Sequence, residues 1–229
     1  MSSQQPTEPY AFGESLPLNG IDPGTTLFVA GDAWSGAEDL ALAMVLAAAD
    51  YDERMVFIST RMSGEKILDQ CAALSSDLDR SRIGIVDCGG QGDADPANDA
   101  RVETVSSAGD LTGIGIKFSS LYGSLYGEAQ NRVRAGFFTV STLLMYTDLR
   151  TAYRFLHTVS GRVTGTDGLC LFLVDPSTHD EQTVSTLAQL CDGRIDTRKT
   201  DDGRRQLRVR GLPDQPEGWQ PFDVSGGDR

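Results

Sequence analysis

The chain has 229 residues, a length that fits one large α/β domain able to bury its own core. Its 33 acidic and 20 basic residues give a net charge of −13, and the only lysines are Lys66, Lys117 and Lys199. An acidic, lysine-poor surface is typical of proteins that stay dissolved in concentrated salt, so the acidity points to the solvent more than to a partner. Because salt screens surface charge, the net charge alone does not argue against nucleic acid.

Neither the cysteines nor the first residues indicate a secreted or membrane protein. The four cysteines are widely spaced, form no Cys-x-x-Cys pair and have no histidine nearby, which predicts no zinc site and no disulfide framework. Residues 1–19 lack a basic segment followed by an apolar one, and we expect a flexible arm. The longest apolar run, residues 40–49, is about half of what a bilayer span needs. We therefore expect a cytoplasmic protein with no membrane partner and no metal ligands.

Strand and helix patterns alternate through the first half of the chain. Residues 25–30 (TTLFVA) form a β-branched and aromatic run ending at Gly31, which predicts a buried strand followed by a turn. Residues 36–49 repeat apolar side chains at helical intervals and predict the first helix. Three further elements follow: a strand at 55–59, a helix at 63–76 capped by Ser63, and a strand at 83–88. Residues 89–100 (GGQGDADPANDA) have no apolar side chain larger than alanine and predict a surface loop.

The second half continues the alternation and then changes character. Its predicted elements are a helix at 119–133, a strand at 137–141, a helix at 149–159, a strand at 169–174 and a helix at 180–191. Residues 169–174 (LCLFLV) are the most apolar run and end in Asp175, as expected of a central strand. Residues 194–199 and 206–210 flank an Asp-Gly turn and predict an antiparallel hairpin.

The pattern predicts an α/β fold of three layers, in which a mostly parallel central sheet ends in the C-terminal antiparallel hairpin. We assign residues 1–19 to the arm, 20–212 to the domain and 213–229 to a tail that packs on the domain. Trp219 and Phe222 are the apolar side chains available to hold this tail.

The segment between the first strand and first helix has the spacing of a phosphate-binding loop, G-x-x-x-x-G-K-[ST]. Gly31, Ser35 and Gly36 would supply its backbone N–H groups at the helix N-terminus. Ala37 and Glu38, however, occupy the positions of the lysine that bridges the phosphates and the hydroxyl that holds Mg²⁺. We therefore predict that no cofactor is needed and that any binding of ATP and Mg²⁺ is weak.

Several segments, in order, make the chain resemble the archaeal KaiC-like members of the RecA ATPase superfamily. They are the loop, residues 20–26 (GIDPGTT), 141–146 (STLLMY), 154–157 (RFLH), 208–211 (RVRG) and the Pro221-Phe222 pair. The resemblance extends over residues 20–224 and, with the acidic composition, indicates a degenerate haloarchaeal member. It implies a RecA-like fold with a sheet-edge nucleotide site.

The resemblance also assigns further site residues. Asp175 would be the strand-end aspartate that positions Mg²⁺, and Arg208 and Arg210 would be fingers that reach a nucleotide held by a neighbouring subunit. Residues 60–62 (TRM) lack the acid that activates the attacking water, so we predict no catalytic residue. On the residues alone, Arg208 and Arg210 fit an interface or a solvated edge balanced by Asp201 and Asp202 equally well.

The function expected first is a non-catalytic, regulatory or protein-interaction module whose partner is itself or a KaiC-like ATPase relative. The alternative is a divergent nucleotide-binding ATPase in signalling or DNA repair. A third reading, binding of single-stranded DNA, needs a groove that combines aromatic and basic side chains, and the sequence shows none clearly. We do not expect nucleic acid as a partner, and we assign no role to His157 or His179.

Overall fold

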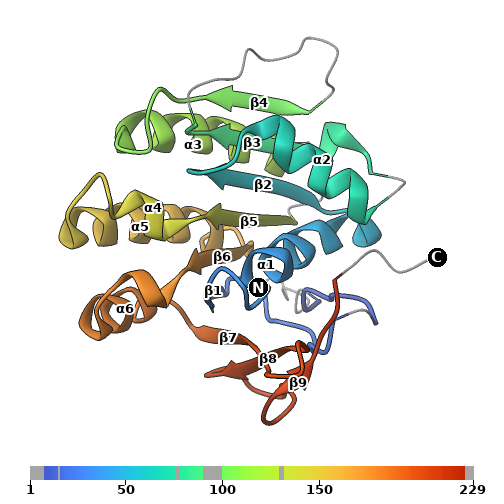
Figure 1. The fold of residues 1–229 in the computed structure, drawn as a ribbon. Helices are drawn as coiled ribbons and strands as arrows, with labels where there is room; N and C mark the ends of the chain where they lie inside the picture. Colours follow the sequence, from blue (N-terminus) through green and yellow to red (C-terminus); the bar gives the residue numbers. More distant parts are fainter. Residues whose placement is uncertain (1–7, 15, 76–77, 90–99, 129–131, 225–229) are drawn as a thin grey trace, which may run out of the picture.

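A nine-stranded sheet forms the centre of the molecule in the computed structural model, which describes residues 8–14, 16–75, 78–89, 100–128 and 132–224 (Figure 1). Its strand order is β4-β3-β2-β5-β6-β1-β7-β8-β9. The strands are β1 (Thr26–Ala30), β2 (Arg54–Ser59), β3 (Ile83–Asp87), β4 (Arg101–Thr104), β5 (Val133–Phe138), β6 (Leu169–Val174), β7 (Gly193–Lys199), β8 (Arg205–Arg210) and β9 (Gln220–Pro221). The pairs from β4 to β7 are parallel, whereas β8 and β9 join antiparallel, as the fold class predicted.

Helices cover both faces of the sheet, because each parallel connection must cross over it. The helices are α1 (Ala37–Leu46), α2 (Gly64–Leu74), α3 (Leu111–Glu128), α4 (Val140–Leu143), α5 (Leu149–Thr164) and α6 (Glu181–Ala188). One apolar core lies beneath α1 and α2, and a second lies beneath α3, α5 and α6. Figure 1 shows α1 and α2 in front of the sheet and the α3 and α5 layer behind it.

Several predicted boundaries were wrong, and the largest differences are at the starts of α3 and β5. Helix α3 begins at Leu111, not at residue 119, because the side chain of Asp110 accepts the Gly113 N–H at 2.8 Å and offsets the weak helix propensity of Gly113 and Gly115. Strand β5 begins at Val133, not at residue 137, although Arg134 interrupts its apolar run. The short, partly exposed strand β4 was not predicted, and most of the acidic loop expected at 89–100 lies outside the described residues.

The expected flexible arm does not fit the described part of residues 1–19. Tyr10, Phe12, Leu16 and Leu18 are buried in the core beneath α1, and Tyr10 forms an antiparallel bridge with Ile21. The Tyr10 hydroxyl donates a hydrogen bond to the Asp167 carbonyl at 3.0 Å. The arm is fixed because it carries apolar side chains that close the amino end of the sheet.

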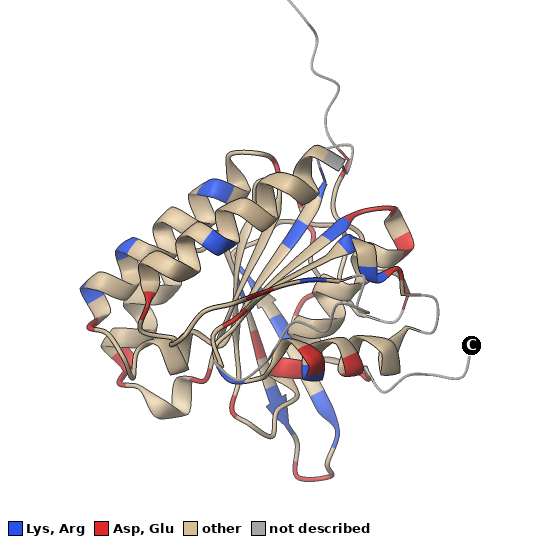
Figure 2. Ribbon diagram, turned by 90° about the horizontal axis from the view of Figure 1, so that it is seen from above, with Lys and Arg blue, Asp and Glu red and all other residues tan. Residues whose placement is uncertain are grey.

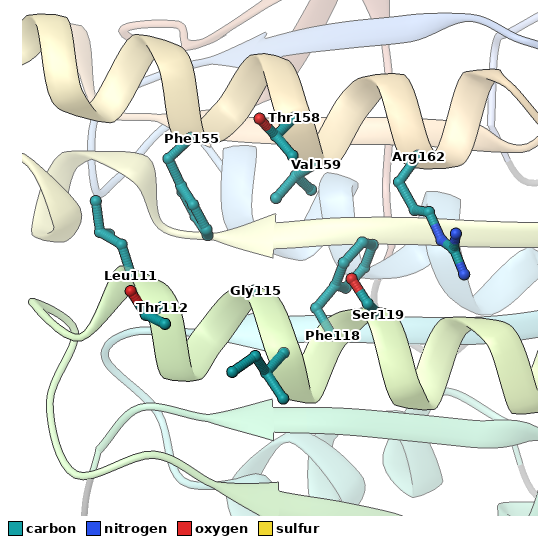
Figure 3. A pocket seen from close by; sticks show the side chains of 10 residues that line it. Leu111, Thr112, Gly115, Phe118, Ser119, Phe155, Thr158, Val159 and Arg162 are labelled. Atoms are coloured by element: carbon teal, nitrogen blue, oxygen red, sulfur yellow. The ribbon is translucent and has the colours of Figure 1, made fainter.

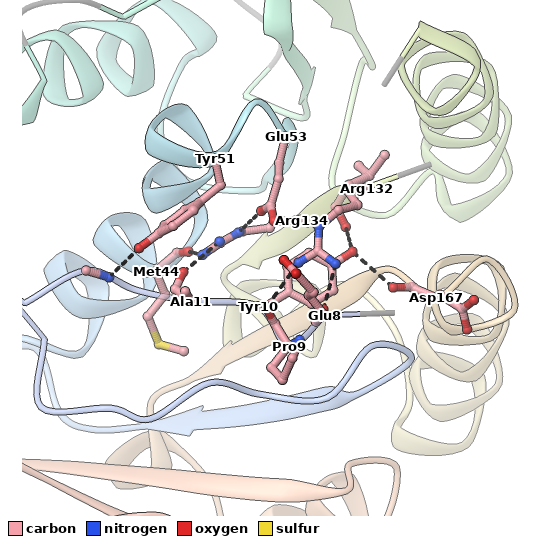
Figure 4. Close-up of polar contacts among 12 residues, drawn as sticks. Glu8, Pro9, Tyr10, Ala11, Met44, Tyr51, Glu53, Arg132, Arg134 and Asp167 are labelled. Carbon is pink, nitrogen blue, oxygen red and sulfur yellow. Dashed lines mark hydrogen bonds and ion pairs between the residues drawn. The ribbon is translucent and has the colours of Figure 1, made fainter. Parts of the chain in front are cut away.

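A buried ionic cluster anchors this segment (Figure 4). Glu53 and Arg134 are almost completely buried, and the carboxylate of Glu53 accepts hydrogen bonds from Arg134 Nε at 2.5 Å and Arg132 Nε at 2.8 Å. Arg134 also donates to the carbonyls of Met44 and Ala11, at 2.9 and 2.7 Å. Burial lowers the pKa of the Arg134 guanidinium, and the Glu53 carboxylate opposes that shift. The cluster joins the arm to α1, β5 and the turn before β2.

The described end of the chain lies against the hairpin. Strand β9 pairs with β8, and Phe222 is buried in the core beneath α1. The guanidinium carbons of Arg198 and Arg208 lie 4.1 and 4.7 Å from the centre of the Trp219 ring. No helix among the described residues is long and apolar enough to cross a membrane.

The cysteines allow a direct test of the packing. Burial raises the pKa of the Cys71 and Cys88 thiols to about 12, and it also raises the pKa of Cys170 and Cys191. Because the thiolate is the reactive form, we expect the native protein to react with a thiol reagent at pH 8 on the order of a thousandfold more slowly than the unfolded chain. A stopped-flow assay with and without denaturant measures this, and fast labelling of Cys71, Cys88 or Cys170 in the native protein would contradict the packing.

Candidate functional site

The loop at residues 31–36 lies at the carboxyl edge of the sheet, between β1 and α1. Strand β1 pairs with β6 so that Ala30 lies opposite Val174, and the Gly31 N–H donates to the Val174 carbonyl at 3.3 Å. The loop and Asp175, which follows β6, are therefore neighbours. Gly36 has a left-handed backbone (φ 80°) that starts α1 at Ala37, a conformation that glycine adopts without strain.

Several polar groups of the loop are hydrogen-bonded to other groups of the same loop. The Asp32 carboxylate accepts the Trp34 N–H at 2.9 Å, and the Asp32 carbonyl accepts the Ser35 N–H at 3.1 Å. Ser35 is fully buried and its hydroxyl donates to the same carbonyl at 2.7 Å. The Ser35 and Trp34 N–H groups are therefore already paired within the loop, where a phosphate would need free donors.

Side chains from β7 and β8 cover the two loop glycines. The hydroxyls of Thr197 and Ser35 lie 2.7 Å apart beside Gly31, so that a Cβ added to Gly31 would overlap both. The stem of Arg205 crosses Gly36, where an added Cβ would lie 2.7 Å from Arg205 Cδ. These side-chain atoms lie against the loop glycines, and a bound phosphate would have to displace them or fit beside them.

The two acidic residues in the first turn of α1 each have an arginine partner. Arg61, which follows β2, pairs with Glu38, and Nη1 of Arg205 lies 2.8 Å from Oδ2 of Asp39. The carboxylates also interact favourably with the positive end of the helix dipole. Arg61 stands within the Thr60-Arg61-Met62 segment, and its guanidinium neutralises the carboxylate of Glu38.

Asp175 serves as a local cap in this structure. Its carboxylate accepts the Ser177 N–H at 2.9 Å and the Ser177 hydroxyl at 2.6 Å, at the start of a 3₁₀ turn (Pro176–Thr178). Its backbone N–H donates to the Ser141 hydroxyl at 2.9 Å. The carboxylate remains half-buried at the sheet edge, where two of its oxygen lone pairs are already used.

Arg208 and Arg210 lie on one face of β8 and approach Asp196 of β7. Nη2 of Arg210 lies 2.5 Å from Oδ2 of Asp196, and Nη2 of Arg208 lies 3.6 Å from the same oxygen. Arg194 Nε donates to Oδ1 of Asp196 at 2.7 Å. Both predicted finger residues therefore have a carboxylate within their own chain.

Sequence reasoning missed four residues that shape this site: Arg61, Asp196, Thr197 and Arg205. Each is far in sequence from the group it contacts or belongs to the hairpin, whose register fixes the contact. No group of three histidine, cysteine, aspartate or glutamate side chains in the described part of the chain is placed to hold a metal ion.

The fold is RecA-like and KaiC-like. The structure is similar to that of a KaiC-like protein from the hyperthermophilic archaeon Pyrococcus horikoshii, with a TM-score of 0.67, 14% sequence identity and 93% of each chain covered. The model of a family of unknown function, DUF7504, matches residues 24–197, and the chain belongs to that family. No curated protein matches the chain.

Proposed function

We propose that this chain is a non-catalytic KaiC-like module with a regulatory or protein-interaction role, in which the phosphate loop has become a structural cap. The observation that carries the proposal is the pair of ionic contacts at the start of α1, Arg61 with Glu38 and Arg205 with Asp39. A nucleotide would meet two carboxylates there, with their cationic partners already engaged. The partner we propose is a second copy or a KaiC-like ATPase relative.

The alternative, a divergent ATPase, would have to replace the missing cation. Arg61 and Arg205 are basic side chains that pair with residues in the first turn of α1, but releasing either one leaves a carboxylate beside the phosphates. Arg208 and Arg210 would need to leave Asp196 before acting on a neighbour's nucleotide. A positioned arginine alone contributes about 10³ to 10⁵ in rate in enzymes of this kind, so the loss of several groups favours the non-catalytic role.

Calorimetric titration with Mg²⁺-ATP in high-salt buffer, together with a phosphate-release assay, tests the proposal. We expect no binding heat up to millimolar nucleotide and no release above the rate without protein. Arg205→Ala serves as a probe of the cap, because it uncovers Gly36 and leaves Asp39 without its cation. If the unaltered protein hydrolyses ATP and Asp175→Asn does not, the proposal is overturned in favour of the ATPase.

A further inference from the structure

A groove of about 730 Å³ runs between α3 and α5 on the outer side of the helix layer behind the sheet (Figure 3). The side chains of Phe118 and Val159 are buried at its floor, and Phe155 stands on the α5 side. Gly115 leaves the α3 wall open, since the nearest atom to an added Cβ is Phe155 Cε2 at 3.6 Å. Ile116 also lines the groove, with 64% of its surface exposed, so the lining is mostly apolar.

The helices that form this groove lack the acidity of the rest of the molecule. The protein has 33 acidic residues, yet α5 has none and α3 has one, its last residue. Arg150, Arg154 and Arg162 are exposed on α5, and none of them pairs with a carboxylate in the part of the chain that the structure describes. In Figure 2, basic positions are spread along this helix layer.

The charged groups around the groove are distributed unevenly. Arg162 lines one end of it, and Arg154 lies one helical turn before the lining residue Thr158. The carboxylates of Asp110 and Asp148 are at the opposite end, where they cap the starts of α3 and α5. An apolar channel with unpaired arginines along one side complements a ligand with an apolar ridge and flanking carboxylates.

We propose that the α3–α5 groove binds an acidic amphipathic helix of a partner protein, with the apolar residues of that helix in the groove and its carboxylates on Arg154 and Arg162. The inference rests on the proposed function of the chain as an interaction module. A helix fits because its apolar residues recur every three or four positions and can follow a groove between two helices. Arginine favours carboxylates, since its planar guanidinium donates two parallel hydrogen bonds to them.

The charge of the remaining surface adds selectivity. A protein with a net charge of −13 repels an acidic helix over most of its surface, whereas the face of α5 has only basic and neutral side chains. Repulsion elsewhere and attraction here would direct the helix to one position. The same argument disfavours a basic helix, which would find partners over much of the molecule but not along α5.

Fluorescence anisotropy with three labelled peptides tests the proposal. Each peptide has about 18 residues, because shorter helices are marginal in water, and carries leucine at helical spacing. The flanking positions are glutamate in the first peptide, glutamine in the second and lysine in the third. We expect the glutamate peptide to bind most tightly and the lysine peptide least, with a difference that shrinks as salt is added.

Two variants and two matched controls locate the binding. Arg154→Glu with Arg162→Glu reverses the charge, and Gly115→Leu fills the groove, so each should weaken binding of the glutamate peptide by at least about tenfold. Lys66→Glu is the charge control on α2, and Gly127→Leu is the volume control on α3, where an added Cβ meets no atom within 4 Å. Both controls should bind as the unaltered protein does, and circular dichroism verifies that every variant is folded.

Several outcomes would overturn the inference. No binding of the glutamate peptide, equal binding of the glutamine peptide, or no effect of Gly115→Leu would each show that the groove does not recognise an acidic helix. Self-association that Gly115→Leu abolishes, or binding to vesicles of anionic phospholipid that the arginine variant abolishes, would assign the face to another occupant. The Mg²⁺-ATP titration tests the proposed function separately. If neither the peptide nor the nucleotide binds, only the inference about the groove is rejected. If the protein turns over nucleotide, the proposed function is rejected.

Discussion

Replacing Glu53 by glutamine is expected to lower the free energy of unfolding by about 3–5 kcal/mol. The change keeps the shape of the side chain but removes the carboxylate that pairs with Arg134, whose side chain is fully buried. Arg134 would retain its hydrogen bonds to the Met44 and Ala11 carbonyls, but its positive charge would have no counter-ion. Denaturant unfolding followed by circular dichroism measures the loss.

Glu65→Gln provides the control, because Glu65 is an exposed glutamate in the first turn of α2. Its replacement should change the unfolding free energy by no more than about 1 kcal/mol. A loss in Glu53→Gln as small as in this control would mean that the guanidinium of Arg134 reaches water or another anion. The cluster would then not be what fixes residues 8–14 to the domain.

Ala37→Lys combined with Glu38→Thr is expected to raise the affinity for Mg²⁺-ATP by about 10- to 100-fold. The double change restores the bridging cation and the magnesium-binding hydroxyl, and a hydrogen bond to a charged group contributes about 1.5–3 kcal/mol. It also removes the carboxylate that pairs with Arg61, which leaves a second cation close to the loop. Calorimetric titration in the same high-salt buffer measures the gain.

The matched control for this gain is Ala37→Met with Glu38→Thr, which adds the length of a lysine without its charge. We expect this control to gain less, because it only removes repulsion. If the lysine variant gained nothing, the loop would be closed by shape and not by charge alone. Arg205 over Gly36 and the Thr197–Ser35 contact beside Gly31 would then be the cause, and adding Arg205→Ala should restore binding.

The fold could be predicted from the sequence because its signals are local. The buried strand at 169–174 and the hairpin around the Asp-Gly turn each depend on a short run of residues, and the alternation of strands and helices implies the parallel sheet. The start of β5 could not be found in this way. In the sequence, Arg134 interrupts an apolar run. Its counter-ion, Glu53, is distant in sequence, so no local pattern shows that this arginine can be buried in a strand.

The candidate site was predictable only in part, for the same reason. The spacing of Gly31 and Gly36 indicated a loop between the first strand and the first helix, but no local pattern links Arg205 to Asp39 or Arg61 to Glu38. These contacts depend on where the hairpin and the end of β2 lie relative to α1. The arm was mistaken for a mobile segment because four scattered apolar residues have no periodicity, although each of them has a place in the core.

The two borders of the sheet affect how molecules of this protein can meet. On one side the outermost strand is β4, with four residues, and on the other it is β9, with two residues, one of which is Pro221. Proline has no N–H to offer a further strand, and short outer strands give an incoming chain few positions to pair with. Growth of the sheet from one molecule into the next through β4 or β9, the usual first step toward fibres, is thus disfavoured.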